Sequence, residues 1–208
     1  MSCVRDLRED EIPQATSIIA RAFARDPALS FLLPDPSDRL RTGTRMVASW
    51  IRYCRGWGAA WCTDGLEGVA LRRPPGSPGL HPWGVVASGM VWAPLWLGLA
   101  ATVRLVRAAV ETGRRHATAV RRPHWYLWMI AVAPEAQGHG HGGALMAHTF
   151  ERADREGVPC FLETTSPRAL DIHAAHGFEV AAEGLVPGTD LQVWSMVRPA
   201  RKRLVMAT

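Results

Sequence analysis

The chain lacks paired cysteines. Its four cysteines, Cys3, Cys54, Cys62 and Cys160, are scattered, and none of them forms a CxxC pair. This spacing argues against a zinc knuckle and against a disulfide framework. Reduced thiols are the default for such a chain, which predicts a cytoplasmic protein. The first turns carry Arg5 and several acidic residues, and a secretory signal peptide does not have this pattern.

Long hydrophobic runs and lysine are also scarce. The longest apolar run, residues 90–103, is about fourteen residues long and contains Pro94, so it is too short to span a bilayer. Only one of the 24 basic residues is a lysine, Lys202, and the net charge is +5. No motif for reading nucleic acid accompanies this charge, so we expect neither a nucleic-acid partner nor a membrane partner.

Basic residues gather in one part of the chain. The cluster consists of Arg104, Arg107, Arg114, Arg115, Arg121 and Arg122. Such a run usually forms a solvated helix face, and this is the interpretation we favour. A basic surface would also help an anionic cofactor to approach the protein.

Tryptophan is abundant, with nine residues in the chain. They are Trp50, Trp57, Trp61, Trp83, Trp92, Trp96, Trp125, Trp128 and Trp194. Most of them are expected to fill the core or the surface. The alternative is that a few of them line a pocket for a flat or apolar acceptor molecule.

Hydrophobic periodicity predicts an α/β protein with a mixed sheet. The expected helices are 12–25, ended by Asp26-Pro27, then 37–54, two pieces within 83–116 interrupted near Pro94, 140–156 and 167–176. The expected strands are 3–7, 59–63, 68–72, 125–132, 158–164, 178–183 and 192–196. The apolar strand 125–132 is expected to be buried on both faces.

The most informative feature is a glycine-rich turn directly after that strand. Gly138, Gly140, Gly142 and Gly143 stand at the opening of the next helix. The first backbone N–H groups of a helix have no intrahelical acceptor, and the helix dipole favours negative charge there. A glycine also lets an anion approach the backbone closely. The sequence therefore predicts a phosphate or diphosphate site.

Two other phosphate-binding motifs compete for this turn. Residues 138–143 satisfy GxGxxG, and Glu163 lies near the distance where a ribose-binding acid stands in a dinucleotide fold. That fold needs several parallel strands after the motif, whereas only about two plausible strands follow Glu163. A Walker loop is excluded, because no Lys-Ser/Thr follows the glycines. Stabilisation by NAD(P) rather than by CoA would identify the dinucleotide alternative.

A third pattern explains more of these residues. Val132, Pro134, Gln137, Gly140 and Gly142 resemble the acetyl-CoA signature of the GNAT N-acetyltransferases, a Q/R-x-x-G-x-G/A turn behind a strand ending in V-x-P. The resemblance implies the α/β GNAT fold, with a mixed central sheet splayed between two middle strands and with flanking helices. It also implies one domain over the whole chain.

The resemblance extends along the chain. It covers residues 123–199 well, as an acetyl-CoA-binding core, and residues 4–72 more loosely, as an N-terminal part. Residues 80–122 would then be a variable helical insert. Within the family the chain looks most like the puromycin N-acetyltransferase group, on the runs 157–159, 161–164 and 194–196.

The resemblance implies how acetyl-CoA, the co-substrate, is held. Backbone N–H groups would bind its diphosphate, and they belong to Gln137, Gly138, His139, Gly140, His141, Gly142 and Gly143. The pantetheine arm would pair like an added strand with Met129, Ile130, Ala131 and Val132. The freed N–H near Ile130 would stabilise the tetrahedral oxyanion, an effect of about 3–4 kcal/mol per donor.

Two residues are candidates for proton transfer. The family's short helix usually carries an Asn and, before Gly-Phe, a Tyr, where this chain has Ala169 and His173. Either His173 protonates the departing thiolate, so that activity follows its titration, or it only packs and water protonates the thiolate. Glu163, at the end of its strand, is either the base for the acceptor's ammonium group or a structural carboxylate.

The histidines do not predict a metal site. His139 and His141 stand two residues apart in the glycine turn, and no carboxylate or cysteine completes a set at ligand spacing. Both stand where many relatives carry basic residues, close to phosphates.

These inferences predict an acetyl-CoA-dependent N-acetyltransferase (EC 2.3.1.-) that acts on a primary amine of a small molecule by direct attack in a ternary complex. Antibiotic-like or other secondary-metabolite amines are the expected acceptors, selected by residues 28–58 and 80–122. A larger acyl group is the nearest variant. The second hypothesis, motivated by Ala169 and His173, is a catalytically weak acyl-CoA-binding or regulatory relative. Monomer and homodimer both stay open.

Overall fold

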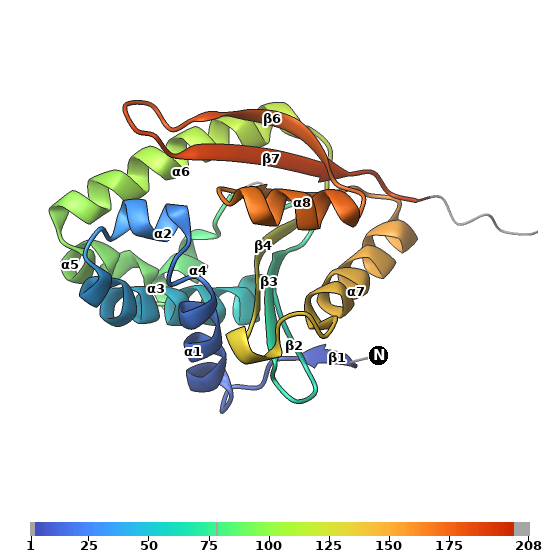
Figure 1. Ribbon diagram of the computed structural model, residues 1–208, viewed down its shortest axis with the longest axis horizontal. Helices are drawn as coiled ribbons and strands as arrows, with labels where there is room; N and C mark the ends of the chain where they lie inside the picture. The colour runs from blue at the N-terminus through green and yellow to red at the C-terminus, as the bar shows by residue number, and fades with distance from the viewer. Residues whose placement is uncertain (1–2, 78, 202–208) are drawn as a thin grey trace, which may run out of the picture.

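The computed structural model describes residues 3–77 and 79–201, which form one seven-stranded sheet with helices on both faces (Figure 1). The strands are β1 (Val4–Asp6), β2 (Ala59–Thr63), β3 (Gly68–Arg73), β4 (Trp125–Val132), β5 (Cys160–Thr164), β6 (Glu179–Leu185) and β7 (Gln192–Arg198). The helices are α1 (Ile12–Ala22), α2 (Pro27–Leu32), α3 (Pro36–Trp57), α4 (Pro82–Ala87), α5 (Ala93–Leu97), α6 (Leu99–Ala119), α7 (His141–Glu156) and α8 (Pro167–Ala175), with short 3₁₀ turns η1 (Met90–Trp92) and η2 (Pro134–Ala136).

The strand order is β1-β2-β3-β4-β5-β7-β6, and β4 and β5 are its parallel pair while the other neighbours run antiparallel. The predicted mixed α/β sheet is therefore confirmed. A dinucleotide-binding fold needs several parallel strands around its glycine motif, so this topology does not fit that alternative.

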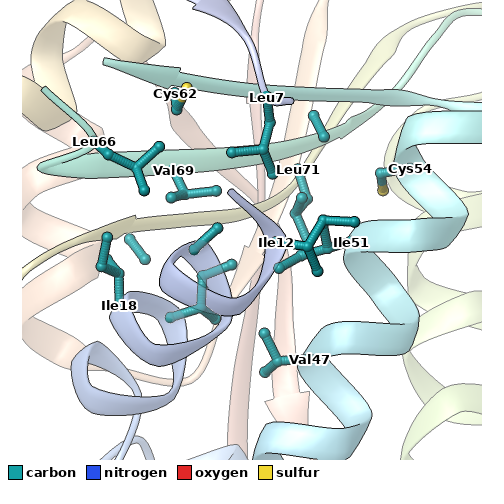
Figure 2. Close-up of a cluster of buried hydrophobic side chains, with 14 of the residues drawn as sticks. Leu7, Ile12, Ile18, Val47, Ile51, Cys54, Cys62, Leu66, Val69 and Leu71 are labelled. Atoms are coloured by element: carbon teal, nitrogen blue, oxygen red, sulfur yellow. The ribbon is translucent and has the colours of Figure 1, made fainter. Parts of the chain in front are cut away.

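Helices α1 and α3 cover one face of strands β1 to β4. The apolar residues of α1 recur at helical spacing, so Ile12, Ala15 and Ile19 form one stripe against the sheet. Figure 2 shows Ile12 beside Ile51 of α3, with Leu71 of β3 close to both. Full burial of each large aliphatic side chain contributes about 1.5–3 kcal/mol, which makes this cluster a main source of stability.

Helix α7 covers the opposite face. Its buried residues Leu145, Met146 and Ala153 pack in a cluster with Leu127 of β4 and Leu162 of β5. The predicted terminator of this helix, Gly157, stands after it with a φ of 68°. The two core clusters thus place the β4–β5 region between two helical layers.

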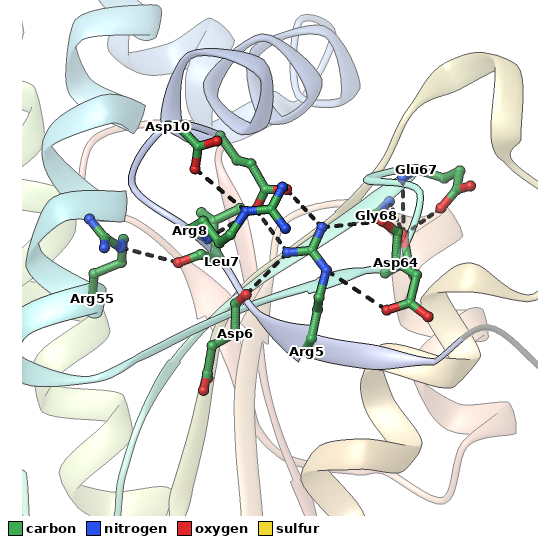
Figure 3. A network of polar contacts seen from close by, with 11 residues as sticks. Arg5, Asp6, Leu7, Arg8, Asp10, Arg55, Asp64, Glu67 and Gly68 are labelled. Carbon is green, nitrogen blue, oxygen red and sulfur yellow. Dashed lines mark hydrogen bonds and ion pairs between the residues drawn. The ribbon is translucent and has the colours of Figure 1, made fainter.

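A polar network holds the edge strand β1 against the start of α1. Both guanidinium nitrogens Nη1 and Nη2 of Arg5 donate to the Glu11 carboxylate, at 2.8 and 2.7 Å, and Arg8 forms an ion pair with the same group at 2.7 Å. Figure 3 shows the Arg5 side chain also directed at Asp64, in the β2–β3 turn. The hydrogen bonds from Arg5 lower the pKa of Glu11 to about 2. The Glu11 carboxylate therefore stays charged at all ordinary pH values.

In the predicted insert, residues 80–122, the helices are interrupted at a different place from the one expected. The long helix α6 begins after Gly98, which has a φ of 76°, and not at Pro94. Pro94 lies in the first turn of α5, where a missing N–H costs no hydrogen bond. Within residues 3–77 and 79–201, no helix is both long enough and apolar enough to cross a membrane.

Arginine side chains fasten α6 to the rest of the fold. Arg104 Nε donates to the Leu32 carbonyl at 3.0 Å, and Arg115 donates to the carbonyls of Gly184 and Leu185 in β6. Figure 1 shows α6 running alongside the β6–β7 hairpin. The prediction of a solvated basic face is therefore wrong for Arg104 and Arg115, because sheet and helix carbonyls come within their reach.

Candidate functional site

Strands β4 and β5 part soon after they meet. Among the described residues their pairing is limited to Trp125 with Cys160 and Tyr126 with Phe161, although β4 continues to Val132 and β5 to Thr164. The remainder of β4 pairs on its other side with β3, where Ile130 lies opposite Ala70. A gap in backbone pairing therefore opens at the middle of the sheet.

A cavity of about 550 Å³ lies on the α1–α3 side of this gap. Both parted strands line it, Tyr126, Trp128 and Met129 from β4 and Glu163 and Thr164 from β5. The rest of its lining comes from the segments 20–50 and 80–112 and from β7. A volume of this size suits a small-molecule ligand.

Glu163 lies in this cavity and is mostly buried. Its Oε2 accepts a hydrogen bond of 2.9 Å from the Tyr126 hydroxyl, and Oε1 lies 3.4 Å from the Ser195 hydroxyl that donates to it. Ser195 stands directly opposite Glu163 across the β5–β7 ladder. Burial raises the pKa of Glu163 to about 7, even though these hydrogen bonds act to lower it. A carboxyl group with this pKa can both take up and release a proton near neutral pH.

A second carboxyl group, Asp26, lines the same cavity. Its Oδ1 caps α2 by accepting from the backbone N–H groups of Ala28 and Leu29, at 2.9 and 3.3 Å. The Thr165 hydroxyl lies 3.5 Å from the same oxygen. Burial raises the pKa of Asp26, and these hydrogen bonds oppose the rise. Asp26 thus has a structural task that Glu163 does not have.

The glycine-rich turn lies where β4 ends and α7 begins. Gly138 and Gly140 both have a φ of 84°, a left-handed conformation that other residues adopt only with strain. Nothing lies within 4 Å of the position that a Cβ would take at either glycine, so the backbone there is open to a ligand. The first turn of α7, including Gly142 and Gly143, presents N–H groups that the helix itself cannot use. This geometry fits a phosphate or diphosphate group.

Contacts from both sides fix the turn. Arg21 of α1 forms a two-bond ion pair with Glu135, at 3.0 and 3.0 Å, and the Ala133 N–H donates to the Glu67 carbonyl at 2.8 Å. His139 Nδ1 lies 3.0 Å from the Gln137 carbonyl, so its imidazole ring folds back onto the turn. These contacts restrain the backbone of the turn.

Known proteins show the same pattern. A profile described as the Acetyltransferase (GNAT) family matches residues 97–178. A structure from Corynebacterium glutamicum, described as histone acetyltransferase HPA2 and related acetyltransferase, is 25% identical, with a TM-score of 0.70 over 99% of this chain and 100% of that chain. The chain therefore has the GNAT fold, and its residues 97–178 match the GNAT acetyltransferase family.

Two further similarities set the limits of this assignment. Mycothiol acetyltransferase from Brachybacterium faecium is 36% identical over 70 residues, which make up 32% of this chain and 19% of that relative. The match thus spans about a fifth of the length of this curated relative. Mosquito arylalkylamine N-acetyltransferase like 5b is 16% identical, with a TM-score of 0.56 over 96% of this chain and 100% of that one, and shares the fold.

Within this GNAT sheet, His173 lies away from the cavity. It is buried on α8, and its ring packs edge-on against Phe178, with 5.8 Å between ring centroids. Burial, with smaller contributions from His176 and Arg72, lowers the pKa of His173 to about 4. The ring is therefore neutral at pH 7, which favours the packing alternative over an imidazolium acid.

The sequence patterns did not identify three residues at this candidate site. Tyr126 and Asp26 had no motif to mark them, since only the fold brings them to Glu163 and Thr165. Arg72 is fully buried beside the gap, with Nε donating to the Thr149 hydroxyl and Nη1 to the Met129 carbonyl, both at 2.8 Å. Its place at the polar end of a short predicted strand gave no sign of burial.

Histidine and carboxylate groups do not converge into a metal centre in the described part of the chain, where no set of three or more His, Cys, Asp or Glu residues is suitably placed. The closest histidine pair is His116 and His124, whose Nε2 atoms are 2.6 Å apart. Both rings pack around Phe161, with His116 stacked on it at 4.1 Å between centroids. These two histidines therefore take part in the packing of α6 against Phe161 of β5.

Proposed function

We propose that this GNAT protein transfers an acetyl group from acetyl-CoA to a primary amine of a small molecule, by direct attack in a ternary complex. One observation carries the proposal. The cavity that contains Glu163 lies on one side of the gap between β4 and β5, and the open glycine turn lies where β4 ends. Two substrates that enter from these two places meet in the gap, where positioning alone accelerates the reaction strongly.

The turn and the end of β4 would hold the co-substrate. Backbone N–H groups from Gln137 to Gly143 bind the diphosphate, and Met129 to Val132 bind the pantetheine arm along the edge that β5 leaves unpaired. The N–H at Ile130 stabilises the oxyanion as the thioester carbonyl becomes tetrahedral. Such a donor typically contributes about 3–4 kcal/mol to the barrier.

Glu163 would be the base. As a carboxylate it takes one proton from the acceptor's ammonium group, directly or through a water molecule, and the free amine then attacks the thioester carbon. A C–N bond forms and the C–S bond breaks, so the sulfur leaves as a thiolate. Water takes the second proton from the attacking nitrogen and protonates the thiolate, because a His173 ring that is neutral at pH 7 is too weak an acid to do so.

The acceptor would be a small amine, as it is by name for the mosquito arylalkylamine N-acetyltransferase. The likeness to the puromycin N-acetyltransferase group supports an antibiotic-like or secondary-metabolite amine. Residues from both expected specificity segments, 28–58 and 80–122, line the cavity. An acyl group larger than acetyl is the nearest variant of this proposal.

Free-thiol release from acetyl-CoA with a panel of primary amines tests the proposal. Acetyl-CoA affinity is measured on the same folded sample by calorimetry. Turnover of at least one amine, dependent on both substrates, is expected. Tight acetyl-CoA binding without turnover of any amine would instead support the acyl-CoA-binding, regulatory alternative. No binding of acetyl-CoA by folded protein would remove both.

A further inference from the structure

The cavity has a chemical character that narrows the acceptor, and this inference rests on the proposed acetyl transfer. Its lining is mostly aliphatic and aromatic, and it comes from α1, α2, α3, α6, β4, β5 and β7. The apolar lining includes Phe23, Leu29, Phe31, Val47, Trp50, Met90, Leu105, Trp128, Met129 and Leu191. A ligand gains free energy there by burying apolar surface and not by forming many hydrogen bonds.

A β-bulge supplies part of the aromatic wall. Met129 pairs with Leu71 and Leu127 pairs with Arg72, so Trp128 is the extra residue between two register positions. Because of the bulge, the consecutive residues Trp128 and Met129 both line the cavity, whereas a regular strand would direct them to opposite faces. Bulges that redirect a side chain in this way often occur beside active sites.

The indole ring of Trp128 packs against a second indole ring in the cavity lining. The Trp50 ring of α3 lies 5.7 Å from the Trp128 ring between centroids, at an interplanar angle of 39°. Tyr53 makes an edge-on contact with Trp128, with 5.9 Å between the ring centroids. Two large flat side chains therefore stand on one side of the cavity, held in place by a third ring. Such a surface can bind an aromatic ring of a ligand by ring packing, or a cationic group by a cation–π contact.

Charge in the cavity is sparse and gathered in one region. Of the described residues that line it, Asp26 and Glu163 are the ones with acidic side chains, and neither lysine nor arginine joins them. Asp26 uses its Oδ1 to cap α2 and to contact Thr165, which directly follows the lining residues Glu163 and Thr164, so both carboxyl groups lie in one part of the cavity. A polyamine would need a second carboxylate near Leu80, Met90 or Leu105, where the lining is apolar. An aminoglycoside would bury many hydroxyl groups without hydrogen-bond partners, which is unfavourable.

We infer that the acceptor is a primary monoamine carried on an aromatic or bulky apolar body, with its ring against Trp50 and Trp128 and its amine directed to Glu163. The same lining disfavours polyamines and aminoglycosides. Trp128 is then a specificity-determining residue that contacts the acceptor and not acetyl-CoA.

Steady-state thiol release at saturating acetyl-CoA tests this inference. The probes are 2-phenylethylamine and tryptamine as aryl monoamines, spermidine as a polyamine and kanamycin as an aminoglycoside. We expect kcat/KM for at least one aryl monoamine to exceed that for spermidine and kanamycin by about 100-fold or more. Trp128→Ala should raise KM for that amine about tenfold or more and leave KM for acetyl-CoA within about twofold.

Trp83→Ala is the matched control, since Trp83 on α4 is 72% exposed and does not line the cavity. It should leave both KM values unchanged. Trp128→Leu supplies the measurement if the alanine variant does not fold, because leucine retains apolar volume while removing the flat ring. A Trp128 variant that folds and keeps the wild-type KM for the aryl amine would overturn the role of this residue.

Preferred turnover of spermidine or kanamycin would overturn the inference on the acceptor and leave the acetyltransferase function intact. Turnover of no amine by folded protein that binds acetyl-CoA would overturn both. These outcomes are separable because acetyl-CoA binding is measured independently of the acceptor.

Discussion

Replacing Glu163 by glutamine tests the buried carboxyl group in two ways. Glutamine keeps the shape and can still accept a hydrogen bond from the Tyr126 hydroxyl, which donates at 2.9 Å in the wild type. It cannot ionise and cannot take up a proton. The change therefore removes the charge and the base while it leaves the packing of the cavity almost unaltered.

The expected size follows from the pKa. Burial raises the pKa of Glu163 from an ordinary 4.5 to about 7 in the folded state. The difference of about 2.5 corresponds to about 3 kcal/mol, at about 1.4 kcal/mol per pKa unit. Because the folded state binds this proton more tightly, the stabilisation is fully present below pH 4.5 and is lost as the pH rises through 7.

Urea unfolding of both proteins between pH 4 and pH 8 measures this effect. The free energy of unfolding of Glu163→Gln relative to wild type should rise by about 3 kcal/mol over that range. Glu179→Gln, a change at an exposed glutamate of β6, is the matched control and should follow the wild-type curve. A difference between Glu163→Gln and wild type that is the same at every pH would refute the reasoning.

Activity gives the second readout. The wild-type kcat/KM for the acceptor should rise with pH through about 7, as Glu163 becomes a carboxylate. Loss of a general base typically lowers the rate by about 10²–10⁴-fold, so Glu163→Gln should be slow and should lack this rise. A variant with the wild-type rate and pH profile would mean that Glu163 is a structural carboxylate.

The remaining predictions concern the turn, α8 and α6. Gly140→Ala should strain a residue with a φ of 84°, at about 1–2 kcal/mol, and weaken acetyl-CoA binding in calorimetry by about tenfold or more, whereas Gly157→Ala, with a φ of 68° at the other end of α7, should lose similar stability and keep its affinity. Equal affinity losses in both variants would contradict a phosphate site at the turn. His173→Ala should retain the shape of the pH–rate profile, since a pKa of about 4 keeps the ring neutral; disappearance of a limb near pH 6.5 would restore the imidazolium acid. Arg115→Met should lower the free energy of unfolding in urea by about 2 kcal/mol, because the β6 carbonyls lose a charged donor, and should raise KM for the acceptor more than for acetyl-CoA. An unchanged KM for the acceptor would mean that the contacts of Arg115 with β6 do not affect acceptor binding in the cavity.

Local patterns were sufficient for most of the helices and strands. Strand β4 was predicted over the same residues as observed, and α7 and its terminator Gly157 were placed to within one residue. These elements have strong local signals, an apolar run and a glycine at each end of a helix. Helix α2 was missed because Asp26-Pro27 has two uses: it ends one helix, and its aspartate and proline also begin the next.

The candidate site divides in the same way. The glycine turn is local, since one helix start provides the N–H groups, and sequence spacing alone therefore located it. The surroundings of Glu163 are not local, because Tyr126 and Ser195 lie 37 and 32 residues away along the chain. The pKa of Glu163 depends on these neighbours and on burial, so no pattern around residue 163 could give it.

The sequence by itself determined the α/β class, the helix start that fits a diphosphate, and the family that the turn resembles, since each depends on residues a few positions apart. Only the tertiary structure decided that β4 and β5 part after two pairs, that a bulge directs Trp128 and Met129 into one cavity, and that Arg104 and Arg115 anchor α6 over it. The physical reason is that strand pairing, burial and charge state depend on segments that meet only when the sheet has formed.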